Sequence, residues 1–261
     1  LIGFPQLLDK VNEHIDRLDY AREPMNLYEP VKYILALGGK RIRPVMMLMA
    51  YNMYRDDVDK ILDPALALEI YHNFTLLHDD LMDNADVRRG KPTVHKRWDA
   101  NTAILSGDVM LSLADVYMSR IDDAYFRQVM ATFHQTSIEI AEGQQYDMDF
   151  ETRTDVAEQE YIEMIRLKTS VLLACALKIG AILGGASEDD AAHLYRLGEC
   201  IGLAFQLRDD YLDVYGDPKV FGKKIGGDIL CNKKTYLYIN ALRLADKEQR
   251  AVLDYWATAT N

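Results

Sequence analysis

Apolar residues recur at helical spacing through the middle of the chain. Across residues 93–217 they return every three or four positions, as Ile162 and Ile165 do, while the strict alternation typical of strands is scarce. No proline lies between Pro92 and Pro218, a stretch too long for a β protein that needs frequent turns. The pattern predicts an all-α bundle of roughly ten helices around a core, if the helices have ordinary lengths.

Short clusters of glycine, proline and aspartate mark where these helices should end. The expected breaks are Gly38-Gly39, Asp56-Asp57, Asn84 to Pro92, Gly184-Gly185 to Ser187, and Gly216-Asp217-Pro218. At 261 residues the chain is near the upper end of what one hydrophobic core supports, so we expect a single domain over residues 1–261. The chain begins without Met and stops at Asn261 inside a helix-like pattern, so we also expect a missing C-terminal segment.

Composition narrows the function. The net charge of −11 argues against non-specific binding of nucleic acid, because phosphate backbones attract basic surfaces. No apolar run approaches 18 residues and residues 1–20 do not resemble a secretion signal, so a cytoplasmic protein is expected. The three cysteines are far apart, which fits reduced thiols. Basic residues nevertheless cluster at 38–44, 88–91, 223–224 and 233–234, which suggests small anions bound with divalent cations.

Two aspartate clusters share one spacing. LLHDDLMD (76–83) and FQLRDDYLD (205–213) each place an aspartate pair three residues before a third aspartate, within an apolar helical pattern. On a helix, residues four apart share one face, about 6 Å apart along the axis. Asp79 with Asp83, and Asp209 with Asp213, should therefore each present two carboxylates in one direction.

Several carboxylates set among apolar neighbours need a compensating cation. Oxygen-only ligands favour Mg²⁺, which usually takes one or two carboxylates and completes its octahedron with water and substrate phosphates. For either cluster alone, a solvated acidic surface is an equally good interpretation. The repetition of the pattern, with apolar flanks in both copies, favours metal.

An ordered series of motifs resembles the trans-prenyltransferases, the family of farnesyl and geranylgeranyl diphosphate synthases and their longer-chain relatives. The series comprises GGKRIRP (38–44), HNFTLLHDDLMD (72–83), RRGKPT (88–93), GQQYD (143–147), KT (168–169), FQLRDDYLD (205–213), GKKIGGD (222–228) and NKKT (232–235). The resemblance implies an all-α isoprenoid synthase fold with a central cavity, two aspartate helices facing each other across its mouth, and a homodimer.

The resemblance also implies roles for individual residues. Mg²⁺, three ions per active site, would be bound by Asp79, Asp80, Asp83, Asp209 and Asp213. The allylic diphosphate would be contacted by Arg88, Lys168, Lys223 and Lys233, and isopentenyl diphosphate by Lys40, Arg43, His72 and Arg89. Neighbouring Arg88 and Arg89 would thus serve different substrates. Asp147 is a further candidate metal ligand, whereas His78 and His95 are interpreted as surface or supporting residues. Taken alone, the segment with Lys40, Arg41 and Arg43 would be interpreted as a solvated basic turn.

The reaction implied by the family is a head-to-tail (1'-4) condensation of isopentenyl diphosphate with an allylic diphosphate. The catalytic candidates are Lys168, which would stabilise the leaving diphosphate, and Thr169 and Gln206, whose oxygen dipoles would face the carbocation. The product should be a short-chain trans-prenyl diphosphate, C15 to C20, because bulky Phe74 beside smaller Thr75 would limit the tail. An ordinary core role for Phe74 is equally open.

Other readings make different predictions. A longer-chain polyprenyl diphosphate synthase would share every motif. A non-catalytic subunit of a heteromeric synthase would require the loss of a motif residue, and none is lost. A terpene cyclase would need a different second metal motif and no isopentenyl pocket. A di-iron carboxylate bundle predicts Glu-x-x-His pairs, which this sequence lacks.

Overall fold

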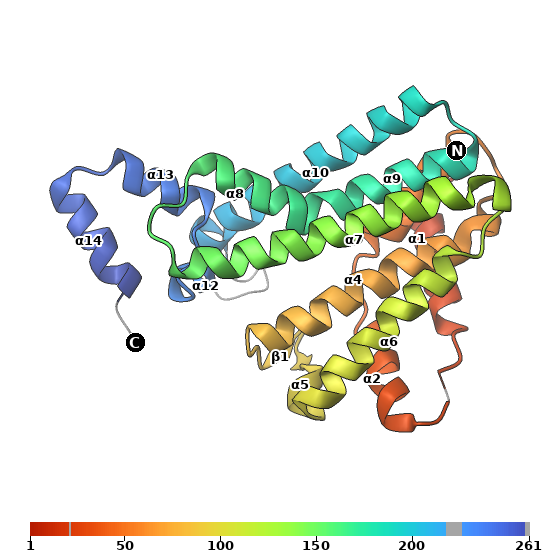
Figure 1. Cartoon of the computed structure of the whole chain (residues 1–261), viewed down its shortest axis with the longest axis horizontal. Helices are drawn as coiled ribbons and strands as arrows, with labels where there is room; N and C mark the ends of the chain where they lie inside the picture. The colour runs from red at the N-terminus through yellow and green to blue at the C-terminus, as the bar shows by residue number, and fades with distance from the viewer. Residues whose placement is uncertain (21, 218–225, 259–261) are drawn as a thin grey trace. The chain divides into compact units, whose positions relative to one another are not determined.

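The computed structural model describes residues 1–20, 22–217 and 226–258, and it confirms the all-α prediction (Figure 1). The helices end where glycine, proline and aspartate predicted. The turn at Gly38-Gly39 separates two helices, and those at Asp56-Asp57 and Gly184-Gly185 do the same. Asn84 to Pro92 forms a hairpin, and a helix ends at Tyr215, just before Gly216.

The backbone groups into two compact units. The first combines Leu1–Thr132 with Ala176–Tyr195, and the second combines Phe133–Cys175 with the chain from Arg196 onward. Their boundaries fall within helices α7 (Asp123–Thr152), α9 (Val171–Gly184) and α10 (Glu188–Tyr215). The single domain over residues 1–261 stays a prediction.

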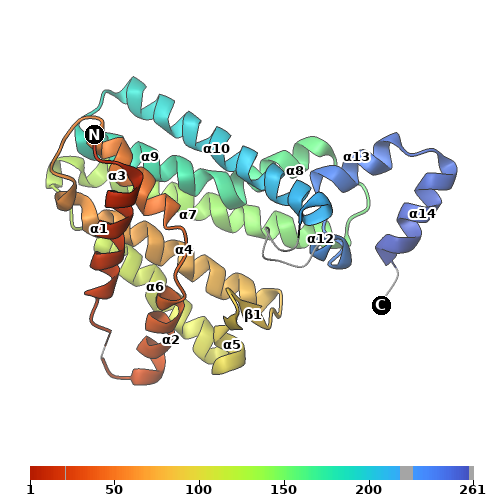
Figure 2. The same ribbon diagram turned by 180° about the vertical axis from the view of Figure 1, so that it is seen from behind.

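The first unit is built around α4 (Leu62–Met82), which packs along α6 (Ala100–Met118) and α3 (Ile42–Asn52), as Figures 1 and 2 show. It also holds α1 (Phe4–Asp16), α2 (Met25–Ala36), η1 (Val58–Ile61) and α5 (Val94–Arg97). Every residue of α4 from Pro64 to Tyr71 is buried, whereas most of the residues beyond it are partly exposed. The helix therefore begins in the core and carries its aspartates to its outer end.

A two-residue hairpin follows α4. Strands β1 (Val87–Arg88) and β2 (Lys91–Pro92) are antiparallel, with Arg88 opposite Lys91. The turn residues Arg89 and Gly90 have φ of 51° and 75°, the left-handed pair that a tight hairpin of matching twist requires. Thr93 Oγ1 donates to the carbonyl of Ala85 over 2.7 Å and closes the loop.

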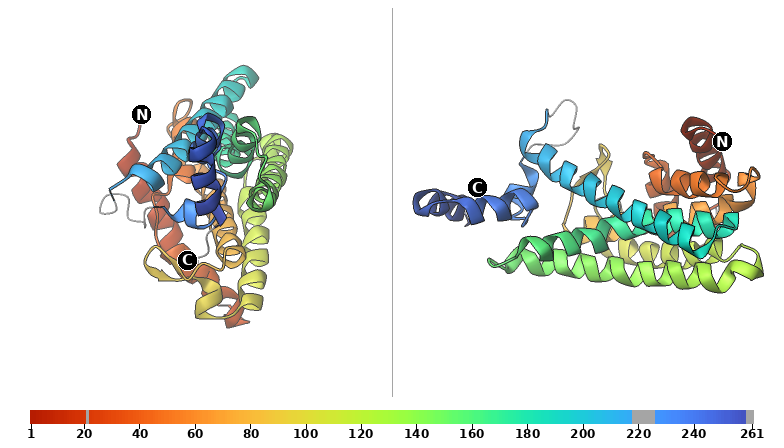
Figure 3. Two further views of the ribbon diagram at one scale, coloured as in Figure 1. Left: turned by 90° about the vertical axis from the view of Figure 1, so that its left-hand side faces the viewer. Right: turned by 90° about the horizontal axis from the view of Figure 1, so that it is seen from above.

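The second unit holds α8 (Glu158–Ile165), the π-helical turn η2 (Arg166–Ser170), α12 (Gly227–Leu230), α13 (Tyr236–Leu244) and α14 (Lys247–Thr258), seen from two more sides in Figure 3. Helix α13 packs on α8. Their shared apolar core consists of Phe150, Val156, Tyr161, Met164, Ile165 and Ile239. This core fixes the start of α8, and with it the turn that follows.

Two glycines let neighbouring helices approach η2 closely. A Cβ on Gly143 of α7 would lie 2.3 Å from the backbone nitrogen of Lys168, and one on Gly202 of α10 would lie 2.4 Å from Cα of Ser170. Neither distance is possible for a real side chain. Glycine at both positions therefore holds α7 and α10 against the turn that carries Lys168 and Thr169, and π-helical turns are frequent at functional sites.

One helical stretch, Glu158–Gly184, is long and apolar enough to cross a membrane, but 83% of its apolar window is buried inside the protein. It has the character of a core helix, and no membrane span is indicated among the described residues.

Candidate active site

The first aspartate cluster lies at the carboxyl end of α4. Asp79 and Asp80 belong to its last turn, and Asp83 is its C-terminal cap. This end carries the negative pole of the helix dipole, which repels carboxylates. A cation bound here would relieve that repulsion.

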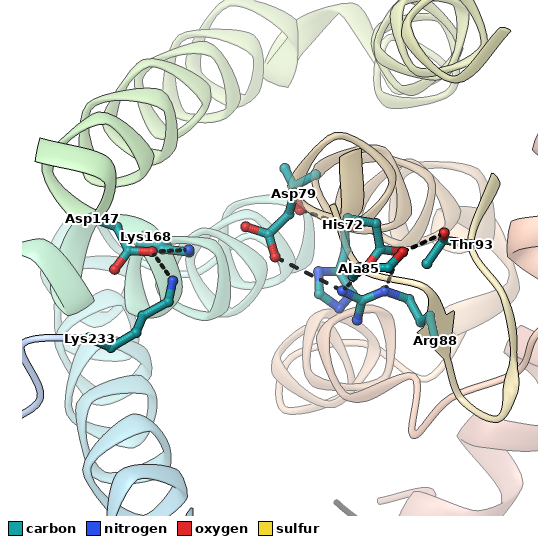
Figure 4. A network of polar contacts seen from close by, with 10 residues as sticks. His72, Asp79, Ala85, Arg88, Thr93, Asp147, Lys168 and Lys233 are labelled. Atoms are coloured by element: carbon teal, nitrogen blue, oxygen red, sulfur yellow. Dashed lines mark hydrogen bonds and ion pairs between the residues drawn. The ribbon is translucent and has the colours of Figure 1, made fainter. Parts of the chain in front are cut away.

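Asp80 is held by Arg88. The guanidinium donates from Nε and Nη2 to the two carboxylate oxygens over 2.7 and 2.8 Å. Its Nη2 also lies 3.9 Å from Asp79, and Figure 4 shows Arg88 beside that residue. Asp80 is only 4% exposed. Burial raises the pKa of Asp80, and the hydrogen bonds and charge of Arg88 oppose that shift. Asp80 is therefore committed to a protein partner, while Asp79 and Asp83 lie nearer the surface.

Arg89 points to a different part of the first unit. In the left-handed turn position its Nη1 donates to the carbonyl of Gly38, and its guanidinium lies so close to Gly39 that a Cβ there would be 2.9 Å from Nη2. The hairpin geometry separates the neighbours. Arg88 is in a strand and reaches the aspartates, whereas Arg89 is in the turn and reaches GGKRIRP. The sequence assigned them to different substrates, and they do have different partners.

A cation cluster forms around His72. Arg43 Nη1 donates to His72 Nε2 over 3.2 Å, and Lys40 is exposed on the preceding turn. Burial lowers the pKa of His72 well below its usual range, and the charges of Arg43 and Arg89 lower it further. Burial also lowers the pKa of Arg43 to about 10. His72 is therefore neutral at physiological pH and accepts the bond from Arg43.

The second aspartate cluster lies in the last turns of α10 and repeats the first arrangement. The hydroxyl of Tyr161 donates to Asp210, and Gln206 Nε2 donates to its other oxygen over 3.1 Å. Burial raises the pKa of Asp210, and these hydrogen bonds oppose the shift. The second aspartate of each pair is thus bound by the protein. Asp209 is partly exposed, as Asp79 is.

A fourth carboxylate joins this cluster. The backbone nitrogens of Asp228 and Gly226 donate to the side chain and the carbonyl of Asp213, over 3.1 and 2.7 Å. Burial, followed by the charges of Asp213 and Asp210, raises the pKa of Asp228 from 3.8 to about 6. Mutual repulsion of this kind is relieved by a bound cation.

Asp147 lies between two lysines. It accepts hydrogen bonds from Lys168 over 2.7 Å and from Lys233 over 2.9 Å (Figure 4). Burial would raise the pKa of Asp147, but the two ammonium charges outweigh it and lower the pKa. The prediction of Asp147 as a metal ligand thus stands beside a clear alternative, in which it holds two lysines together. Lys223 lies outside the described residues.

The other candidates also find partners. Thr169 Oγ1 donates to Gln206 Oε1 over 3.3 Å, so the two predicted dipoles are neighbours. Half-buried Phe74 makes edge-on ring contacts with Tyr71 and His78, at 5.4 and 4.9 Å between ring centres. Thr75 donates to the carbonyl of His72 over 2.8 Å.

Sequence reasoning missed Tyr161 and Asp228. Tyr161 lies 49 positions from its partner, and no motif pointed to it. Asp228 ends GKKIGGD, so a signal was present, but its nearness to Asp213 depends on the fold of the intervening chain. Arg41, which a solvated basic turn would leave in water, has a side chain that is only 4% exposed.

The residues fit magnesium by their chemistry. Every candidate donor is a carboxylate oxygen, which suits a hard cation, and both clusters carry like charges at a negative helix end. Within the described residues no three His, Cys, Asp or Glu side chains already converge as a ready metal site.

Comparisons with known proteins agree on one family. The sequence model of the polyprenyl synthetases matches residues 24–261. A geranylgeranyl diphosphate synthase of Methanosarcina mazei is 44% identical over 233 residues, which are 88% of this chain and 72% of that protein. A geranylfarnesyl diphosphate synthase of Natronomonas pharaonis is 40% identical over 250 residues, 88% of this chain and 73% of that protein. A crystal structure of a geranylgeranyl pyrophosphate synthase superposes with a TM-score of 0.94 at 49% identity, covering 99% of this chain and 79% of that one.

Proposed function

We propose the following reaction for this chain, which belongs to the polyprenyl synthetase family: a head-to-tail condensation of isopentenyl diphosphate with an allylic diphosphate, giving a short-chain trans-prenyl diphosphate and diphosphate. The chain is a trans-prenyltransferase. The observation that carries the assignment of residues is the hairpin, which directs Arg88 to a carboxylate cluster and Arg89 to the carbonyl of Gly38, beside the cation cluster. A reaction of two diphosphates needs two such anion sites.

Isopentenyl diphosphate is assigned to the cation cluster. Arg43 and Arg89 offer planar forks of donors suited to phosphate oxygens, and exposed Lys40 offers a compact charge. His72 accepts from Arg43 and thereby fixes the orientation of that guanidinium. With Nε2 engaged and a lowered pKa, His72 is a positioning group and not a general base.

The allylic diphosphate is assigned to the carboxylates and the basic residues beside them. Magnesium, when bound, would neutralise charge on the departing diphosphate. Asp79, Asp83, Asp209 and Asp213 would hold it, with Asp80 and Asp210 keeping neighbouring groups in place. Arg88, Lys168 and Lys233 would contact diphosphate oxygens directly, and Lys223 is proposed for the same role.

The reaction then needs little from the protein beyond electrostatics. The carbon–oxygen bond of the allylic diphosphate breaks, and the double bond of isopentenyl diphosphate attacks the resulting cation. A proton leaves the adjacent carbon, and the released diphosphate takes it. Thr169 and Gln206, already hydrogen-bonded to each other, would direct oxygen dipoles toward the cation.

We further propose a C20 product, three Mg²⁺ ions per active site, and a cytoplasmic homodimer. The relatives named for geranylgeranyl diphosphate support the product, and Phe74 offers a steric limit on the first aspartate helix. Exposed Ile104, Leu105 and Val116 on α6 support association with a second copy, since they leave apolar surface on one helix.

Product analysis tests the proposal. The purified chain is incubated with Mg²⁺, isopentenyl diphosphate and each of the C5, C10 and C15 allylic diphosphates, and the dephosphorylated products are sized by mass. We expect products extended by five-carbon units, ending mainly at C20. No product from any starter would instead support a non-catalytic subunit, and a main product beyond C25 would support a longer-chain synthase.

A further inference from the structure

A buried ion pair lies beneath the cation cluster. Arg41 Nη1 donates to Glu69 Oε1 over 2.6 Å, and the two side chains are only 4% and 3% exposed. Glu69 is on α4, ten residues before Asp79, in the fully buried half of that helix. No step of the proposed reaction uses either residue.

The pair connects the turn at residues 38–43 to the buried half of α4. Arg41 caps the start of α3 with a left-handed backbone, φ 47° and ψ 34°, which a side-chain-bearing residue adopts only when its surroundings demand it. In that conformation its side chain turns inward, and Nη2 donates to the carbonyl of Leu35 near the end of α2 over 2.7 Å. One guanidinium therefore joins α2, the start of α3 and α4.

Glu69 is itself held in place. Asn73 Nδ2 donates to the Glu69 side chain over 2.9 Å and to its carbonyl over 2.8 Å. The carboxylate also acts on the cations above it, since its charge raises the pKa of both Arg43 and Arg89 against the lowering effect of burial. A single buried carboxylate thus supports three arginines.

We propose that Arg41 and Glu69 are positioning residues for isopentenyl diphosphate. The bonds of Arg41 to Glu69 and Leu35 hold the 38–43 turn in one conformation. In that conformation the carbonyl of Gly38 accepts from Arg89, and Arg43 donates to His72. The negative charge of Glu69 offsets the mutual repulsion of Arg41, Arg43 and Arg89 before the anion arrives. This rests on the proposed function, because it takes the cation cluster as the isopentenyl site.

Stability alone is a weak reason for such a pair. Replacing a buried ion pair with well-packed apolar residues is often neutral or stabilising, whereas removing one partner leaves an unpaired buried charge. Replacing both partners therefore separates positioning from folding. The double variant Arg41→Met with Glu69→Leu keeps the volume and removes the charges, the bond to Leu35 and the support of Arg43 and Arg89.

The decisive readout is affinity for isopentenyl diphosphate in EDTA, by calorimetry, where no metal-dependent anion site contributes. We expect the double variant to bind about ten- to a hundredfold more weakly, the range for losing one hydrogen bond to a charged group. With Mg²⁺ present, the KM for the allylic diphosphate should change less than about twofold. Glu69→Gln, which keeps the bond from Asn73, is the second variant if the double variant does not fold.

A matched control is Arg120→Met, which breaks the 3.1 Å pair with Asp63 in the same unit. This control should change neither the affinity for isopentenyl diphosphate nor the KM for the allylic diphosphate. Unchanged isopentenyl affinity in the folded variants, or equal weakening of both substrates, would overturn the inference while leaving the reaction intact. A wild-type chain that binds and condenses nothing would overturn the proposed function, and the inference with it.

Discussion

The guanidinium of Arg88 binds both carboxylate oxygens of Asp80 over 2.7 and 2.8 Å. Tyr161 and Gln206 bind the two oxygens of Asp210 in the same way. Asp80 and Asp210 occupy the same position in the two repeated motifs, the second of each aspartate pair. Each motif therefore buries its second aspartate on a protein partner and leaves the first nearer the surface for metal.

Arg88→Lys tests the two-pronged hydrogen bonding of Arg88 to Asp80. Lysine keeps the charge, but it cannot make two parallel hydrogen bonds to one carboxylate. We expect kcat/KM for the allylic diphosphate to fall about ten- to a hundredfold, as for loss of a charge-assisted bond. The KM for isopentenyl diphosphate should change little, because Arg89 keeps its own partner. Arg97→Lys on nearby α5 is the control. Equal loss for both substrates would show that Arg88 and Arg89 are not separated by role.

Tyr161→Phe removes the hydroxyl that donates a hydrogen bond to Asp210. A buried acceptor that loses a partner costs about 1–3 kcal/mol. The expected result is a lower free energy of unfolding by that amount in denaturant titration, together with slower turnover. The control Tyr211→Phe changes a half-exposed residue on α10, the helix of Asp210, and should cost less than about 0.5 kcal/mol. If Tyr161→Phe matches this control, the bond does not hold the second cluster.

The fold and the aspartate clusters followed from sequence because both depend on local rules. Gly184-Gly185 and Gly216 ended helices as expected, and the expected breaks at Asn84 and Gly216 leave Asp79 and Asp209 near the ends of α4 and α10. A four-residue period fixes which side chains share a helix face, whatever the helix packs against.

The side chains that bind these aspartates could not be predicted from sequence, because their contacts depend on tertiary packing. Tyr161 reaches Asp210 only because α8 packs beside α10, and Arg41 turns inward only because its backbone is left-handed. A charged residue in a basic motif is expected at the surface, so the buried position of Arg41 contradicts the usual solvent preference of arginine. The two-residue turn Arg89-Gly90, which gives Arg88 and Arg89 different partners, was expected only as a break.

Asp228 should make the metal-free protein sensitive to pH. Its pKa rises from 3.8 to about 6 on folding, so between these values the folded state binds more protons than the unfolded state. Stability is therefore lost as pH rises through about 4 to 6. Solvent screening of this half-buried group leaves roughly 1 kcal/mol.

Asp228→Asn removes that titration. In EDTA at pH 7.5 the variant should melt about 2–4 °C above wild type, and the difference should vanish at pH 4. Magnesium with inorganic diphosphate should reduce the gain, since a cation relieves the same repulsion. A constant difference at all pH values would mean that the charge of Asp228 is not responsible.

Phe74→Ala should lengthen the product by at least one five-carbon unit. The ring lies on α4 five residues before Asp79, roughly 7.5 Å along the axis, and contacts Tyr71 and His78 edge-on. Removing it opens space where the growing tail would end. Product sizing by mass spectrometry gives the answer, with Tyr71→Leu as the comparison. An unchanged product spectrum for Phe74→Ala would place the limit elsewhere, with Tyr71 or Ile70 as the next candidates.

Turnover of Asp79→Ala and Asp209→Ala tests the central claim most directly. Exposed Asp108 on α6 supplies the control, Asp108→Ala. With Mg²⁺, isopentenyl diphosphate and geranyl diphosphate, condensation should fall at least about a hundred- to a thousandfold in both cluster variants, as when an electrostatic stabiliser of the leaving group is removed. Circular dichroism and the control should match wild type. Condensation near the wild-type rate in either folded variant would contradict the role of the two clusters.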